Sequence, residues 1–131
     1  MEDSIFTKII KGVIPCYKIA EDDKFIAFLD VNPLKEGHTL VVPKTQIDYI
    51  YDLPEDVLSE LFIFSKIVAK KIENSIKCER IGIAVVGLEV PHAHVHLIPI
   101  NKISDINFQR PRKIFTNEDL KKTTIKILES N

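Results

Sequence analysis

Three of the four histidines in this chain lie within five positions, as His92, His94 and His96. Alternate side chains of a β-strand project from the same face, so the three imidazoles are expected to line one surface while Ala93 and Val95 pack on the other. Near neutral pH an imidazole can act as a nucleophile, a proton donor or acceptor, or a metal ligand. The spacing therefore predicts a reactive polar face on a half-buried strand.

Two kinds of chemistry fit such a face. In a metal site, the outer pair of histidines would be separated by about 13 Å of extended backbone, whereas zinc–nitrogen bonds are only about 2 Å. Two histidines could bind one ion, and Glu89 is close in sequence, but the third histidine would need another role. In nucleophilic catalysis on phosphorus, a neutral imidazole attacks while its neighbours donate to phosphate oxygens and to the leaving group. His94, with a neighbour on each side, suits the attack.

Composition narrows the classes of protein to consider. The 131 residues carry a net charge of −1, so no bulk field favours nucleic acid or an anionic membrane as a partner. Cys16 and Cys78 lie far apart and form neither a zinc ribbon nor a disulfide framework, which favours a reducing, cytoplasmic location. The acidic start is unlike a signal peptide, and no apolar run approaches the ~18 residues of a membrane span. We expect one domain, residues 1–131.

Hydrophobic periodicity predicts the elements that must position the histidines. Short and long helices alternate with runs of strands joined by short connections, which indicates an α+β fold with an antiparallel sheet. The strand over 81–87 is apolar on successive residues and is predicted to be central. The expected helices are 5–10 behind an Asp3 or Ser4 cap, 54–72 and 116–128; the expected strands are 17–20, 24–30, 38–43, 81–87 and 94–100.

The segment from His92 to Ile98 resembles the His-x-His-x-His-apolar-apolar signature of the histidine triad (HIT) superfamily of nucleotide hydrolases and transferases. Further segments agree in order along residues 4–100 and look like the small branch that includes the purine nucleoside phosphoramidases. Residues 101–131 form a variable C-terminal segment. The agreeing segments are 4–10, 14–15, 21–23, 27–30, 37–44 and 87–91.

This resemblance implies a role for each site residue. His94 would form a nucleotidyl-histidine intermediate at the α-phosphate of a purine nucleotide or nucleotide conjugate, and water would then hydrolyse it. His92 and His96 would orient the nucleophile and contact phosphate, and Asp30 would accept the ribose hydroxyls. No cofactor is implied, and the family's small members are two-fold homodimers whose sheets join. An apolar base pocket would be formed by Ile5, Phe6, Ile9, Phe28 and Val31.

The chain departs from the family pattern at several positions. An Asn in the strand before the triad and a Gln after the glycine are absent, since 81–86 is apolar and Leu88 follows Gly87. Ser4 and Thr7 occupy the places of a zinc-binding Cys-x-x-Cys, so no structural metal is expected, and Gln46 stands where many relatives have His.

Two positions and two other functions stay open. His38 matches a common family residue of unassigned purpose. The basic run 110–113 could reach a phosphate tail or form a solvated loop. The alternative functions are a nucleotide-binding regulatory module with little turnover and a histidine-ligated metal hydrolase.

Overall fold

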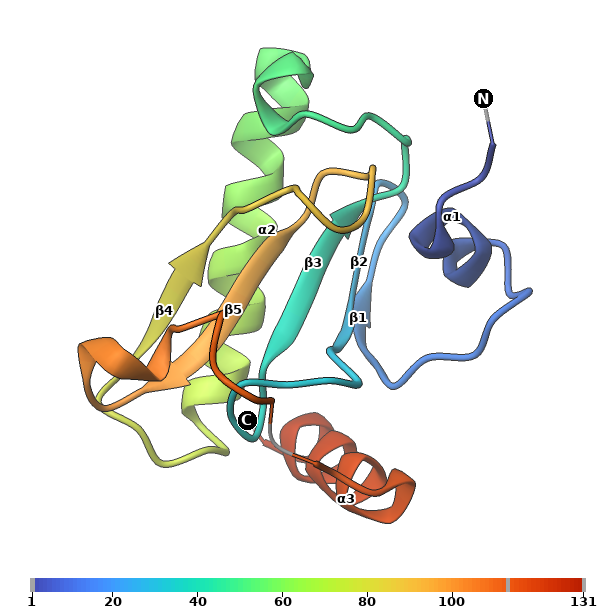
Figure 1. Cartoon of the computed structure of the whole chain (residues 1–131). Coiled ribbons are helices and arrows are strands. Elements are labelled where there is room, and N and C mark those ends of the chain that lie inside the picture. Colours follow the sequence, from blue (N-terminus) through green and yellow to red (C-terminus); the bar gives the residue numbers. More distant parts are fainter. Residues whose placement is uncertain (1, 113, 131) are drawn as a thin grey trace.

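The computed structural model describes residues 2–112 and 114–130 and confirms an α+β fold. Five antiparallel strands form one sheet in the order β1-β2-β3-β5-β4 (Figure 1). The strands are β1 (Lys18–Glu21), β2 (Phe25–Leu29), β3 (Thr39–Pro43), β4 (Arg80–Ala84) and β5 (Val95–Ile100). The helices are α1 (Ile5–Ile10), α2 (Glu55–Glu73) and α3 (Asn117–Leu128), with 3₁₀ turns η1 (Ile50–Asp52) and η2 (Ile103–Asp105).

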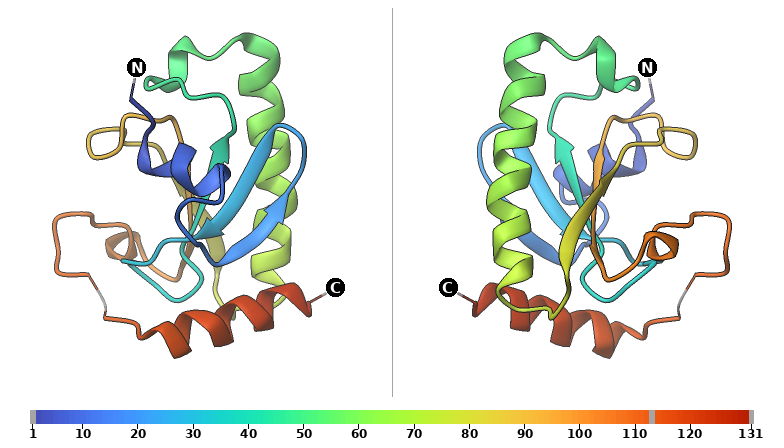
Figure 2. Two further views of the ribbon diagram at one scale, coloured as in Figure 1. Left: turned by 90° about the vertical axis from the view of Figure 1, so that its right-hand side faces the viewer. Right: turned by 90° about the vertical axis from the view of Figure 1, so that its left-hand side faces the viewer.

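The sheet separates two apolar layers. Helix α2 covers one face, and α1 lies against the opposite face (Figure 2). The layer under α2 is the larger one and includes alternate residues of β5 and of the residues just before it. The layer under α1 is small and is centred on Phe6 and Phe28, whose rings meet edge to face at 5.6 Å. The reactive residues described below lie in this second, thinner layer.

The helix ends follow the expected capping chemistry. Ser4 caps α1, because its hydroxyl accepts a hydrogen bond from the Thr7 amide at 3.0 Å. Pro54 precedes α2, whose first turn carries Glu55 and Asp56 at the positive end of the helix dipole. Thr116 and Asp119 form the predicted capping box at the start of α3.

The prediction of a central strand over 81–87 is wrong. Strand β4 ends at Ala84 and forms an edge of the sheet, paired only with β5 among the described residues. Its Ile83 side chain is 55% exposed. A continuous apolar run shows that both faces avoid water, but it does not say whether this chain or another surface covers them. Val85, Val86 and Gly87 lie in the connection between β4 and β5.

The strand that was expected to begin at His94 begins one residue later, at Val95. The residues before it are nevertheless held by hydrogen bonding, since the Ala93 amide donates to the Ile47 carbonyl at 2.7 Å. Across residues 2–112 and 114–130, no helix is both long enough and apolar enough to cross a membrane.

Candidate active site

The three triad histidines lie on the face of the sheet that carries α1. All are buried: His92 is 0%, His94 6% and His96 7% exposed. The rings of His94 and His96 are 4.9 Å apart, and the Phe6 ring of α1 packs edge to face on His94 at 4.9 Å. The intervening Ala93, Val95 and Leu97 point into the core under α2. The predicted alternation, with the histidines on one face and the packing residues on the other, is therefore confirmed, although two of the histidines precede the strand.

His94 is held in one tautomer by a single hydrogen bond. Its Nδ1 lies 2.7 Å from the backbone carbonyl of His92, which can only accept, so Nδ1 carries the proton. The other nitrogen, Nε2, is then an unprotonated lone pair, with no hydrogen-bond partner among the described residues. A carbonyl that fixes Nδ1–H also keeps the ring in one orientation. His94 thus presents a nucleophilic nitrogen in a fixed position.

The ring of His92 is fully engaged inside the protein. Its Nε2–H donates to the Pro43 carbonyl at 2.7 Å, so its Nδ1 accepts the Ser4 hydroxyl at 2.7 Å. With both nitrogens bonded and no exposed surface, this imidazole is not placed to touch a substrate. The expectation that His92 contacts phosphate gains no support from this geometry. Its carbonyl orients His94 instead.

Ser4 belongs to a polar cluster that joins α1 to the triad. The Thr7 hydroxyl donates to the Gln46 side-chain oxygen at 2.6 Å, and the Ser4 amide donates to the same oxygen at 2.8 Å. Ser4 and Thr7 occupy the places of the zinc-binding Cys-x-x-Cys that the family resemblance implies. Hydroxyl and amide oxygens are not the thiolate and imidazole ligands that structural zinc sites use. The residues present do not fit that metal, and hydrogen bonds join them directly.

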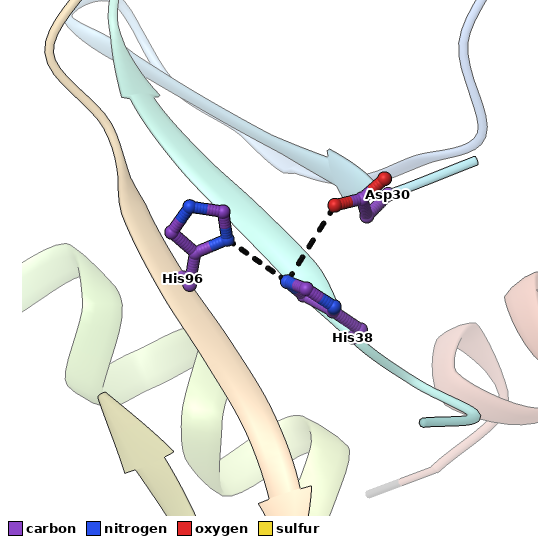
Figure 3. A group of neighbouring side chains, drawn as sticks. All are labelled: Asp30, His38 and His96. Carbon is purple, nitrogen blue, oxygen red and sulfur yellow. Dashed lines mark hydrogen bonds and ion pairs between the residues drawn. The ribbon is translucent and has the colours of Figure 1, made fainter. Parts of the chain in front are cut away.

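A chain of hydrogen bonds runs through His38 to His96 (Figure 3). The Leu34 amide donates to His38 Nδ1 at 3.0 Å, so the His38 proton is on Nε2. His38 Nε2 lies 2.9 Å from His96 Nδ1, which must therefore accept. The proton of a neutral His96 is then on Nε2, at the other side of the ring. His38 therefore fixes the tautomer of His96, with the proton on Nε2.

Burial keeps the four imidazoles neutral at physiological pH. Desolvation is the main cause in each case: it lowers the pKa of His38 and of His96 from 6.5 to about 3, and it lowers the pKa of His92 and His94 as well. The positive charge of Arg112 contributes to the lowering at His38 and His96. Neutral imidazoles are the forms that the tautomer assignments above require.

Asp30 closes this network and forms with the two histidines a group that could hold a metal ion. The ligand atoms of Asp30, His38 and His96 lie within 4.8 Å of one another (Figure 3). One Asp30 oxygen accepts the Asn32 amide at 2.8 Å, and the other lies 3.6 Å from His38 Nε2. An ion bound here would have to displace the hydrogen bond between His38 and His96. The arrangement is complete without one.

A cavity of about 190 Å³ opens in front of these groups. Of the residues predicted to bind nucleotide, Ile5, Phe6 and Asp30 line it, together with His94 and His96. Three predicted pocket residues are not among the lining ones. Phe28 is buried behind Phe6, Ile9 packs on the layer under α1, and Val31 is 65% exposed.

Two lining residues of the variable C-terminal segment were not assigned to the base pocket from the sequence. The Phe108 ring packs on His96 at 4.8 Å, and the Arg112 guanidinium lies 5.2 Å from the Phe108 ring centre. Phe108 belongs to no periodic pattern, and only the positive charge of Arg112 was visible in the sequence. The solvated-loop interpretation of the basic run is wrong for Arg112, whose side chain is 17% exposed.

A second, larger cavity of about 640 Å³ lies on the other side of His94. It is bounded by the start of α2 and by the connection between β4 and β5, with Tyr49, Tyr51 and Phe62 among its walls. His94 lines both cavities. His94 therefore borders open space in two separate cavities.

Comparison with known proteins identifies the family. Residues 11–103 match the model of the HIT domain. An uncharacterized HIT-like protein of Borreliella burgdorferi is 39% identical over 125 residues, covering 87% of each chain. An adenosine 5'-monophosphoramidase of Schizosaccharomyces pombe is 38% identical over 97 residues, covering 72% of each chain.

Comparison with solved structures leads to the same family. A hypothetical histidine triad nucleotide-binding protein of Sulfolobus tokodaii superposes with a TM-score of 0.81 at 31% identity, covering 95% of this chain and 89% of that one. The matched segment carries the alternating histidines, and the fold extends the likeness to nearly the whole chain. This chain belongs to the HIT family.

Proposed function

We propose that this protein is a hydrolase that cleaves a phosphoramidate or related bond at the α-phosphate of a purine nucleotide, with His94 as the nucleophile. The observation that carries the proposal is the His94 tautomer: its Nδ1–H is bonded to the His92 carbonyl, its Nε2 has no hydrogen-bond partner among the described residues, and the residue lines both cavities. A pKa lowered by burial keeps this nitrogen unprotonated at neutral pH.

The reaction would proceed in two steps. His94 Nε2 attacks the α-phosphorus, a nitrogen–phosphorus bond forms, and the bond to the leaving group breaks with its electron pair going to the leaving atom. The leaving amine takes up a proton and departs. Water then attacks the same phosphorus and loses a proton to solvent, the bond to His94 breaks with its electron pair returning to Nε2, and the nucleoside monophosphate is released.

His96 would assist as a hydrogen-bond donor. Because His38 occupies its Nδ1, its proton is on Nε2, and this N–H of a residue that lines the cavity would stabilise negative charge on a phosphoryl oxygen. With its pKa lowered to about 3, His96 is not a cationic acid at neutral pH. In the proposed reaction, the proton for the leaving amine is assigned to water or to the substrate.

The nucleoside would bind beside Asp30. One carboxylate can accept two adjacent ribose hydroxyls, and the outer oxygen of Asp30 has only long contacts, 3.6 Å to His38 and 3.8 Å to Arg112. Ile5 and Phe6 supply apolar surface for a purine face. The name of the S. pombe relative, an adenosine 5'-monophosphoramidase, supports an adenosine phosphoramidate as the first substrate to test.

The test is release of AMP from adenosine 5'-phosphoramidate. The wild-type protein should release AMP, and His94→Ala should lose at least about a thousandfold in kcat, because the attacking atom is gone. Unchanged melting temperature and retained AMP binding would show that the variant is folded. Equal rates for the two proteins would refute the proposal. Tight AMP binding by a wild-type protein that releases no AMP would favour the binding module with little turnover.

We also propose that the protein works as a homodimer joined through β4. This strand leaves one edge unpaired within the described chain, and Ile83 on it is 55% exposed. Next to β4, Phe62 of α2 and Val85 of the β4–β5 connection line one cavity and are each 38% exposed. A second copy would pair the free edge and cover these side chains. Light scattering should report twice the chain mass, and Ile83→Lys should lower it; a monomeric wild type would refute this.

A further inference from the structure

The segment that follows η2 folds back over the proposed nucleotide cavity. We call residues 106–112 the strap; it lies on the side of the sheet opposite α2 (Figure 2). At its start, Ile106 packs so closely on β4 that a Cβ on Gly82 would lie 2.7 Å from its Cδ1. Within it, the Arg110 side chain donates to the Asp105 carbonyl at 3.2 Å. At its end, Arg112 enters the cavity.

Arg112 is fixed from three directions. Its Nη1 donates to the Asn32 carbonyl at 2.6 Å and lies 3.8 Å from Asp30 Oδ2. Its guanidinium packs over the Phe108 ring, which in turn packs on His96. A guanidinium has five N–H donors, and the structure assigns one of them to a hydrogen bond. Several donors therefore remain beside the histidines, on a side chain that is only 17% exposed.

Arg112 offsets the negative charge of the acidic residues that line the cavity. Among its lining residues in the described part of the chain, Asp30 and Glu89 are acidic, the histidines are neutral, and Arg112 is the one cation. Without Arg112 the lining would carry two negative charges and would repel a phosphate. A nucleotide phosphate needs a positive partner, and Arg112 is the cation that residues 2–112 and 114–130 place in this lining.

We propose that Arg112 is a substrate-binding residue and that its guanidinium holds the anionic phosphate of the bound nucleotide. This inference rests on the proposed function, because it takes the same cavity as the nucleotide site. Phe108 and the Asn32 carbonyl keep the guanidinium in place, and its loose contact with Asp30 leaves that carboxylate available to the sugar. Arginine suits this task because its planar fork can donate two hydrogen bonds to one phosphate.

Calorimetric binding of AMP and of adenosine separates this role from a structural one. Arg112→Gln should weaken AMP about tenfold or more, the loss expected for a charge-assisted hydrogen bond, and should change adenosine less than about twofold. Arg112→Lys should recover part of the AMP affinity. Arg110→Gln is the matched control: it removes a guanidinium from the same strap but outside the cavity lining, and it should change neither ligand.

Three other results would overturn the inference. Equal weakening of AMP and adenosine by Arg112→Gln would show that Arg112 acts only through Asp30 or the strap's conformation, and would overturn the inference. Unchanged AMP binding would overturn it as well, with the proposed function left intact. A wild-type protein that binds neither AMP nor adenosine would refute the proposed function itself, and the inference with it.

Discussion

Replacement of Ser4 by alanine tests the connection between the N-terminal helix and the triad. The Ser4 hydroxyl accepts from the Thr7 amide as the cap of α1, and it donates to Nδ1 of the fully buried His92. Loss of the cap costs about 1 kcal/mol. An unsatisfied buried acceptor costs about 1–3 kcal/mol more. Together, Ser4→Ala should destabilise the protein by about 2–4 kcal/mol.

The size of the effect can be measured by calorimetric melting. For a chain of 131 residues, the expected loss corresponds to a melting temperature lower by about 7–15 °C. Thr116→Ala is a matched control, because Thr116 caps α3 through the Asp119 amide at 3.0 Å with no histidine behind it. Its cap alone should be worth about 4 °C. Equal shifts for the two variants would refute the contribution assigned to the bond with His92.

Three further predictions follow from the site. Burial lowers the folded-state pKa of His38 and His96 from 6.5 to about 3. Between these two pH values, the unfolded chain therefore binds more protons than the folded protein does. The unfolding free energy should fall by up to about 1.4 kcal/mol per histidine per pH unit as the pH drops below 6.5; urea titrations in which His38→Gln is as pH-sensitive as the wild type would contradict this. Asp30→Asn should weaken the binding of AMP about tenfold more than that of 2',3'-dideoxy-AMP, since a charged acceptor for the ribose hydroxyls is lost. Equal weakening of both ligands would refute the proposed contact between Asp30 and the sugar. Dialysis against a chelator should leave AMP release unchanged, and its loss, restored by zinc, would instead favour a metal held by Asp30, His38 and His96.

Local patterns were sufficient for most of the elements that carry the site. The alternation at 92–97 indicated both the reactive face and the packing face, because strand geometry converts a spacing of two into a shared side. Ser4 and Thr116 could be recognised as caps from their types and positions alone. The place of β4 could not, because an apolar run says nothing about which surface will cover it.

The residues that the sequence did not explain act over long separations. The purpose of His38 depends on a bond to His96, 58 residues away, and on the Leu34 amide that fixes its tautomer. Phe108 and Arg112 reach the site because the strap folds back after η2, and no periodicity predicts that return. Conversely, Val31 fits an apolar pocket by type, but its side chain points into solvent.

The central claim is that His94 becomes covalently linked to the nucleotide. The most direct measurement is rapid-quench mass spectrometry of the protein during turnover of adenosine 5'-phosphoramidate, with digestion at neutral or alkaline pH to preserve the acid-labile phosphorus–nitrogen bond. We expect one adenylyl group on the peptide that contains the triad, attached to His94 and absent from His94→Ala. Turnover with no adenylylated peptide at any quench time, or with the group on another residue, would contradict it.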